Sequence, residues 1–178
     1  MKFGLTQYTL DHFFNRVLER FADRPALALV GDEPFTYNDF GHRVDELKST
    51  LRTMGIKKQD NIAILGQSSP NWATAYLAIT TLGAVAVPIL EEFPSDDIEH
   101  ILRHADIKAA FIAKSHYDRL SFERLRNINI IFQLDDFSVL LDAGSAATRL
   151  WKPLHELPKI IKGFDRANTT EEQIDEED

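Results

Sequence analysis

The spacing of apolar residues along the chain first predicts helices. Apolar side chains recur three and four positions apart, which is the period of one face of a helix. The stretch that begins at Pro70 is apolar on most faces, so we expect a central, buried helix that ends before Gly83. The pattern predicts helices over residues 10–22, 37–54 and 70–82, a further helix that begins at Pro94-Ser95, and another at about 116–126.

Residues 37–54 form the clearest of these helices. Thr36 can cap its first turn, and Asp39 stands three residues later, near the positive end of the helix dipole. Gly55 stands where a left-handed residue commonly follows a helix, and Ile56 can fold back on the last turn. Both ends of this helix are therefore predicted from the sequence.

Short uncharged apolar runs between the helices predict strands. They cover residues 61–65, 84–89, 109–113 and 129–134. Strands that alternate with helices in this way predict an α/β fold with a mostly parallel sheet. Pro88 has no N–H to donate to a neighbouring strand, so it marks the end or the edge of its strand. Residues 26–37 predict a β-hairpin around a Gly31-Asp32 turn, between the first two helices.

The pattern weakens beyond Asp136, and the chain ends in an acidic stretch. Residues 138–161 could contain helix, but no boundaries can be read. Residues 171–178 hold six acids and no base, and without them the net charge falls from −8 to −2. We therefore expect residues 1–168 to form an α/β subdomain. Residues 169–178 are expected to be a disordered acidic tail or linker.

The composition excludes several classes of protein. A nearly neutral body offers no basic face, so we expect no nucleic-acid partner. The sequence has no cysteine, which excludes disulfides, cysteine zinc sites and thiol catalysis. No stretch reaches the ~20 apolar residues of a membrane span, and the N-terminus has no signal-peptide core. We expect a cytoplasmic protein without a transmembrane segment.

The glycines argue against a phosphate-binding loop. A dinucleotide fingerprint needs glycines two and three residues apart, and a Walker loop needs two that are five apart. No two glycines in this chain are closer than ten residues; they stand at positions 4, 31, 41, 55, 66, 83, 144 and 163. Neither motif can therefore form.

His100 and His104 have the spacing of a metal site on a helix. They are four residues apart, as in two-histidine zinc sites, and Glu99 stands beside them. In the zinc protease motif the glutamate follows the first histidine, whereas here it precedes it. We therefore favour a solvated helix face over a metal site.

Asp135 and Asp136 follow the last predicted strand. Ligand sites of α/β proteins collect at the carboxyl ends of strands, so the two acids are candidate site residues. Acids in that position more often cap a helix or stabilise a loop, and we favour that interpretation.

Three serines and two aromatic residues also have a structural interpretation. Ser68, Ser69 and Ser115 have no histidine placed to activate them, so we favour helix capping. Trp72 and Tyr76 stand four apart on an apolar helix and fit its core. The sequence therefore predicts no catalytic, cofactor-binding or metal-binding residue.

The order of these segments resembles the N-terminal part of the acyl-adenylate-forming enzymes, most of all the long-chain fatty acid CoA ligases. The family pattern runs from a "pAl" strand through "TY.el", a "G" and "GD.VAi" to "N.peW" and "GAv.vP". The residues that match it in order are Ala26-Leu27, Thr36-Tyr37, Gly55, Asp60, Ile62-Ala63-Ile64, Pro70, Trp72, Gly83-Ala84-Val85 and Val87-Pro88. The resemblance covers residues 9 to about 135. Gln59 replaces the usual glycine and Ser69 stands near the usual asparagine, both at turn or cap positions.

The resemblance implies a piece of a longer ligase. Such an enzyme would use ATP and Mg to activate a carboxylic acid and would then transfer the acyl group to coenzyme A. The family's ATP-binding loop comes after the matched region. We therefore expect a structural fragment that is inactive alone, binds none of these cofactors, and has the remainder of its own polypeptide as its partner. The fragment is also expected to self-associate. A self-contained α/β module that binds a small ligand or a protein is the alternative.

Overall fold

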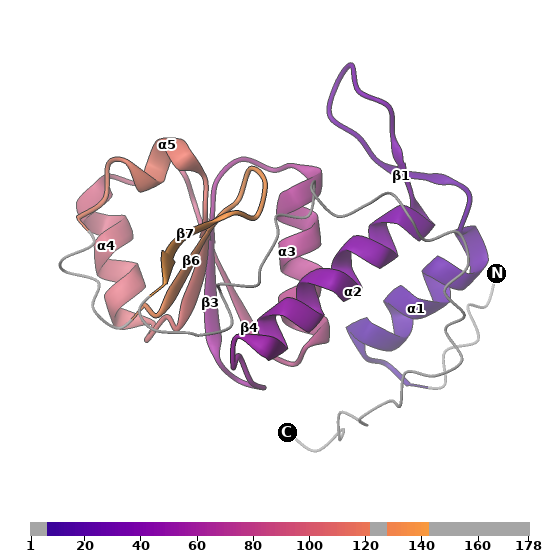
Figure 1. Ribbon diagram of the computed structural model, residues 1–178, viewed down its shortest axis with the longest axis horizontal. Helices are drawn as coiled ribbons and strands as arrows, with labels where there is room; N and C mark the ends of the chain where they lie inside the picture. The colour runs from indigo at the N-terminus through magenta and orange to yellow at the C-terminus, as the bar shows by residue number, and fades with distance from the viewer. Residues whose placement is uncertain (1–6, 122–127, 143–178) are drawn as a thin grey trace.

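A five-stranded sheet with helices on both faces forms the centre of the molecule (Figure 1). The computed structural model describes residues 7–121 and 128–142. Its strands are β3 (Asn61–Leu65), β4 (Val85–Ile89), β5 (Ala109–Ile112), β6 (Ile130–Gln133) and β7 (Val139–Asp142). They lie in the order β4-β3-β5-β6-β7, and all pair in parallel except β6 with β7. The predicted α/β fold with a mostly parallel sheet is confirmed.

The helices divide between the two faces of the sheet. On one side α2 (Tyr37–Thr53) and α3 (Pro70–Thr81) cover the sheet, and α1 (Leu10–Phe21) packs against these two helices. The other face is covered by α4 (Ser95–His104) and by the short α5 (Lys114–Tyr117). Figure 1 shows the two groups on opposite sides of the sheet.

Strand β3 shows why the sheet strands have continuous apolar sequences. Ile62 and Ile64 pack into the cluster under α1, α2 and α3, whereas Ala63 and Leu65 pack toward α4. All four side chains are fully buried. A strand that is covered on both faces has no solvated side to place polar residues on.

The ends of α2 are formed as the sequence predicts. Thr36 and Asp39 make a reciprocal capping box, with Thr36 Oγ1 3.1 Å from the Asp39 N–H and Asp39 Oδ2 3.0 Å from the Thr36 N–H. Gly55 has a φ of +83°, and the Ile56 N–H donates back to the Leu51 carbonyl.

Helix α3 is less buried than the sequence predicts. Its sheet-facing residues, such as Ala75 and Ile79, are fully buried. Trp72, Tyr76 and Leu77 are only half-buried, because α2 packs along one side of α3 and another part of its surface stays partly open. The prediction of a helix buried on most faces is therefore wrong for this side.

Strand β4 is an outer strand of the described sheet and pairs only with β3 there. Pro88 lies within it, which confirms the prediction that this proline marks an end or an edge. Val85 N–H donates toward β3, to the Asp60 carbonyl. Alternate residues of a strand direct their backbone groups to opposite sides, so Pro88 faces the open side and offers no N–H there.

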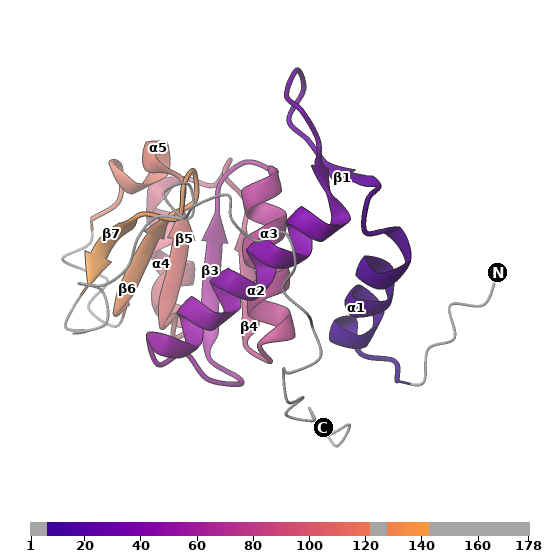
Figure 2. The ribbon, with the colours of Figure 1, turned by 45° about the vertical axis from the view of Figure 1, so that its right-hand side comes forward.

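A two-stranded hairpin precedes α2. It pairs β1 (Pro25–Leu27) with β2 (Phe35–Thr36) in antiparallel orientation, which confirms the predicted hairpin. Gly31 has a φ of +95° at its tip. Figure 2 shows this hairpin standing away from the sheet.

One prediction near the end of the described chain is wrong, and a segment that the sequence left open begins with a strand. The helix expected at 116–126 begins earlier and ends at Tyr117, so 118–121 are not helical, while 122–127 lie outside the described residues. Strand β7 lies at the start of residues 138–161, for which the sequence set no element boundaries. The expected tail at 169–178 also lies outside the described residues, as does everything after Asp142.

Candidate functional site

The carboxyl ends of the parallel strands form one side of the molecule, at which α/β proteins usually bind ligands. We call this the carboxyl end of the sheet. Gly66, directly after β3, has a φ of +153°. A Cβ there would lie 2.8 Å from Leu134 Cδ2 and 2.9 Å from the Ala113 Cβ. The loops that follow β3, β5 and β6 are therefore in close contact at this point.

Asn71 connects three elements at the carboxyl end. Its side-chain nitrogen lies 3.1 Å from the Leu134 carbonyl oxygen and 2.6 Å from that of Asp135. Its side-chain oxygen accepts a hydrogen bond of 2.9 Å from Arg43 Nη2. The amide therefore links α2 and the first turn of α3 to the end of β6. No local sequence pattern singles out Asn71, because its partners lie far away in the chain.

Asp135 and Asp136 have the structural roles that the sequence favours. Asp135 Oδ2 accepts a hydrogen bond of 3.0 Å from the N–H of Lys114, the first residue of α5. Asp136 Oδ1 accepts from the N–H and the hydroxyl of Ser138, two residues on. One acid caps a short helix and the other stabilises a turn, so the capping and loop interpretation is confirmed.

Arg43 is the positively charged side chain that donates to Asn71. Its guanidinium lies over the Phe35 ring, 4.6 Å from the centroid. Burial lowers the pKa of Arg43, and the nearby Glu46 and Asp39 carboxylates oppose that shift. Within the described residues its buried Nε has no hydrogen-bond partner. Phe35 and Asn71 together fix the position of this side chain.

A second polar contact at the carboxyl end joins the loop after β4 to α5. His116 Nε2 lies 3.6 Å from Glu91 Oε2. His116 is 8% exposed, and its Nδ1 has no partner in the part of the chain that the structure describes. No sequence motif marks this pair, whose two residues lie in different elements.

The helix-capping prediction is confirmed for only one of the three serines. Ser69 caps α3, accepting a hydrogen bond of 3.1 Å from the Trp72 N–H, as predicted. Ser115 lies inside α5, whose N-cap is Ala113, so the capping prediction is wrong there. Ser68 is exposed and precedes the cap.

Trp72 and Tyr76 stack on each other, with ring centroids 5.4 Å apart and planes 8° from parallel. Both are half-buried against the core cluster. They therefore lie at the margin of the core rather than inside it.

His100 and His104 lie on the outer face of α4 and are both exposed, as the solvated-face interpretation predicts. Glu99 is separated from them. It is 4% exposed, and its Oε1 accepts a hydrogen bond of 2.7 Å from the Ser121 N–H. Residues 7–121 and 128–142 contain no group of three or more His, Cys, Asp or Glu that could hold a metal ion.

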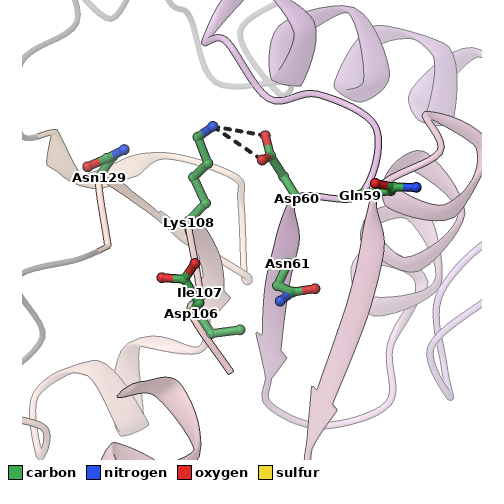
Figure 3. A pocket seen from close by; sticks show the side chains of 7 residues that line it. All are labelled: Gln59, Asp60, Asn61, Asp106, Ile107, Lys108 and Asn129. Atoms are coloured by element: carbon green, nitrogen blue, oxygen red, sulfur yellow. Dashed lines mark hydrogen bonds and ion pairs between the residues drawn. The ribbon is translucent and has the colours of Figure 1, made fainter. Parts of the chain in front are cut away.

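The opposite side of the sheet, at which β3, β5 and β6 begin, carries a pocket of about 260 Å³. We call this the amino end of the sheet. Figure 3 shows the side chains of Lys108 and Asp60 pointing toward each other, with Nζ 3.1 Å from Asp60 Oδ2. The residues that line the pocket are Gln59, Asp60, Asn61, Asp106, Ile107, Lys108 and Asn129.

The contact of Asp60 and the backbone conformation of Gln59 give structural reasons for two positions of the family pattern. Asp60 Oδ2 also accepts a hydrogen bond of 2.7 Å from the Lys57 N–H, so this acid fixes the turn before β3. Gln59 has a φ of +67°, a conformation that glycine adopts without strain. The usual glycine at this position therefore has a conformational reason, which Gln59 satisfies at some cost in strain.

The profile of the family described as "AMP-binding enzyme" matches residues 14–178. The chain belongs to the AMP-binding enzyme family. It is 30% identical to Surfactin synthase subunit 2 of Bacillus subtilis (strain 168) over 103 residues, which are 58% of this chain and 3% of that protein. It is 31% identical to Long chain acyl-CoA synthetase 3 of Arabidopsis thaliana over 85 residues, which are 48% of this chain and 13% of that protein.

A solved structure shows the same fold in this family. The anthranilate CoA ligase AuaEII, in complex with anthranoyl-AMP, superposes with a TM-score of 0.67 at 22% identity. The match covers 75% of this chain and 26% of the ligase. The chain therefore spans only a small part of the relatives it matches, and it corresponds to a piece of a larger adenylate-forming domain.

The polar groups described at the carboxyl end are not arranged to hold Mg-ATP. The widely spaced glycines form no phosphate loop. Asn71, Asp135 and the Lys114 N–H are already occupied with one another or with neighbouring backbone at the carboxyl end. These groups hold loops of the described chain together and are not presented as donors to a triphosphate.

Proposed function

We propose that this chain is the N-terminal part of an acyl-adenylate-forming ligase of the long-chain fatty acid CoA ligase type, acting in the cytoplasm. The match to the AMP-binding enzyme family over residues 14–178 carries the proposal. In the parent enzyme a carboxylic acid reacts with ATP to give an acyl-adenylate and pyrophosphate, and coenzyme A then displaces AMP. ATP, Mg and coenzyme A are therefore cofactors of the whole enzyme, and the chain supplies scaffold.

The fatty-acid assignment is the finer part of this proposal. The long chain acyl-CoA synthetase supports it, but Surfactin synthase subunit 2 is similar at nearly the same identity. The test is acid-dependent exchange of labelled pyrophosphate into ATP by the intact enzyme that carries this chain. Exchange with long-chain fatty acids is expected. Exchange only with amino acids or aryl acids would exclude the fatty-acid assignment and keep the adenylate-forming one.

A separate experiment tests the scaffold role of the isolated chain. Calorimetry with Mg-ATP should detect no binding, because the described residues offer no phosphate cradle. A micromolar dissociation constant would contradict the scaffold role and favour the alternative, a self-contained α/β module with its own ligand.

The outer strand β4 supports a further part of the proposal, self-association of the isolated chain. Val85 is 45% exposed and Leu90, just after the strand, is 62% exposed. Pro88 weakens backbone pairing at this edge, so contact through these apolar side chains is expected instead. Light scattering over a concentration series tests this. A chain that stays monomeric, with or without the added remainder of its polypeptide, would favour the self-contained module.

Among the described residues no helix is both long and apolar enough to cross a bilayer.

A further inference from the structure

Helix α4 presents two histidines side by side to solvent. The rings of His100 and His104 lie 5.9 Å apart between centroids and 7° from parallel. The opposite side of α4 packs on the sheet, where Ile98 and Leu102 are each 1% exposed. Packing therefore fixes the helix, while both imidazoles stay accessible from outside.

Their spacing suits chelation of one ion. Residues four apart on a helix have Cβ atoms about 5–6 Å apart. Two nitrogens that share an ion at bond lengths near 2.1 Å lie roughly 3 Å from each other. Neighbouring parallel rings reach this separation by modest rotations about their side-chain bonds. Within residues 7–121 and 128–142, the ring stack is the contact that the structure records for these two side chains.

The charges around the pair favour a cation. Asp96 and Asp97 lie in the first turn of α4, three or four residues before His100, and both are exposed. Arg103 stands next to His104, but its Nε is 3.3 Å from the Glu99 carbonyl oxygen, one turn back along the helix. The guanidinium is thereby drawn toward the helix backbone.

We propose that His100 and His104 together bind one divalent late transition metal ion, with water in the remaining coordination positions. Imidazole nitrogen is a preferred ligand of Cu²⁺, Ni²⁺ and Zn²⁺, whereas Mg²⁺ and Ca²⁺ prefer oxygen. The described residues supply no third protein ligand of the usual types. The site is therefore an open, two-histidine clip near the end of α4, and it does not depend on the proposed ligase function.

Titration calorimetry of the full 178-residue chain with Cu²⁺, Ni²⁺ and Zn²⁺ tests the proposal. One ion per chain should bind, most tightly for Cu²⁺, and Mg²⁺ should give no heat. Replacing either histidine, in His100→Gln or His104→Gln, should weaken Ni²⁺ binding by about a hundredfold, because a two-point attachment becomes a single one. His42→Gln on α2 is the matched control and should leave the affinity unchanged.

Each alternative outcome overturns the proposal. If His100→Gln and His104→Gln bind Ni²⁺ as tightly as the unaltered chain, the ion is held elsewhere. If only one of them weakens binding, the site is a single imidazole and no chelate forms. Both positions are exposed, so the variants should fold, and far-ultraviolet circular dichroism confirms it. A melting temperature that rises with Ni²⁺ in the unaltered chain, but not in His100→Gln, is a second supporting measurement.

Discussion

At the carboxyl end of the sheet Asn71, Asp135 and Asp136 hold neighbouring loops together, whereas at the amino end the polar side chains, some of them also bound to backbone, surround an open pocket. Two asparagines show the difference. Asn71 uses its amide nitrogen on two carbonyl groups and its oxygen on Arg43. Asn129, at the start of β6, is exposed and lines the pocket.

Residue type and position do not by themselves make a binding site. In α/β proteins the carboxyl end is the usual place for ligands. Here Asp135, the candidate acid at that end, is engaged as a helix cap. At the amino end Asp60 and Asn61 also bind neighbouring backbone, but Asn129 is exposed, and this is the side of the sheet where such sites are rare. Substitutions at the two ends should therefore differ sharply in their effect on stability.

The largest effect is expected at Gly66. In Gly66→Ala the new Cβ would lie 2.9 Å from the Ala113 Cβ, and the φ of +153° is strained for any side chain. The free energy of unfolding, measured in urea, should fall by about 3 kcal/mol. The control is Gly31→Ala, where φ is +95° but no atom lies within 4 Å. It should lose only about 1 kcal/mol, from backbone strain. Equal losses would mean that the carboxyl-end loops are not closely packed.

The next effect compares the two asparagines directly. Asn71→Ala removes the partner of Arg43 Nη2 and of two carbonyl groups, so we expect a loss of about 2 kcal/mol. Asn129→Ala should change stability by less than about 0.5 kcal/mol, because its side chain is exposed. Chemical denaturation of both variants measures the difference. If Asn129→Ala lost as much stability as Asn71→Ala, the side chains at the two ends of the sheet would contribute equally to stability, against this prediction.

A smaller effect is expected for the ion pair at the pocket. The side chains of Lys108 and Asp60 are 37% and 20% exposed, so water screens their attraction. A double-mutant cycle with Asp60→Asn and Lys108→Met should give a coupling energy below about 1 kcal/mol, and less at high salt. A larger coupling energy, or one that does not change with salt, would show that this ion pair stabilises the amino end as strongly as the hydrogen bonds stabilise the carboxyl end.

The sequence predicts the centre of this fold well for a physical reason. The strands β3, β5 and β6 are covered on both faces, so each one is a continuous apolar run. Strand β7 was missed because Val139, Leu140 and Leu141 are all half-buried and show no alternation. Helix α5 has only four residues, too few for a helical period to appear.

The contacts at the carboxyl end could not be predicted in the same way. Asn71 and Leu134 are 63 positions apart in the chain, and their hydrogen bond depends on how β6 is placed beside α3. No local pattern contains that information. The roles of Asp135 and Ser69, by contrast, follow from the local preferences of acids and serines for helix starts, and these were predicted.

The smallest effect is expected at Glu46, which lies one turn along α2 from Arg43. It tests whether burial or neighbouring charges set the pKa of this carboxyl group. Burial raises the pKa of Glu46, while His42 and Arg43 oppose the shift. A carboxyl with a raised pKa in the folded state binds its proton more tightly there than in the unfolded chain. Its contribution to stability is therefore present below the ordinary glutamate pKa and is lost as pH rises through the raised value.

Glu46→Gln keeps the shape of the side chain and removes this titration. Relative to the unaltered chain, the variant should gain stability as pH rises from the acid side toward neutrality, and the measurement is urea denaturation at a series of pH values. Salt separates the two causes, because it screens the attraction of His42 and Arg43 but not the burial of the carboxylate. The gain should therefore persist, or grow, at high salt. A loss of stability toward neutrality that salt reduces would show instead that the attraction of His42 and Arg43, and not burial, sets the pKa of Glu46.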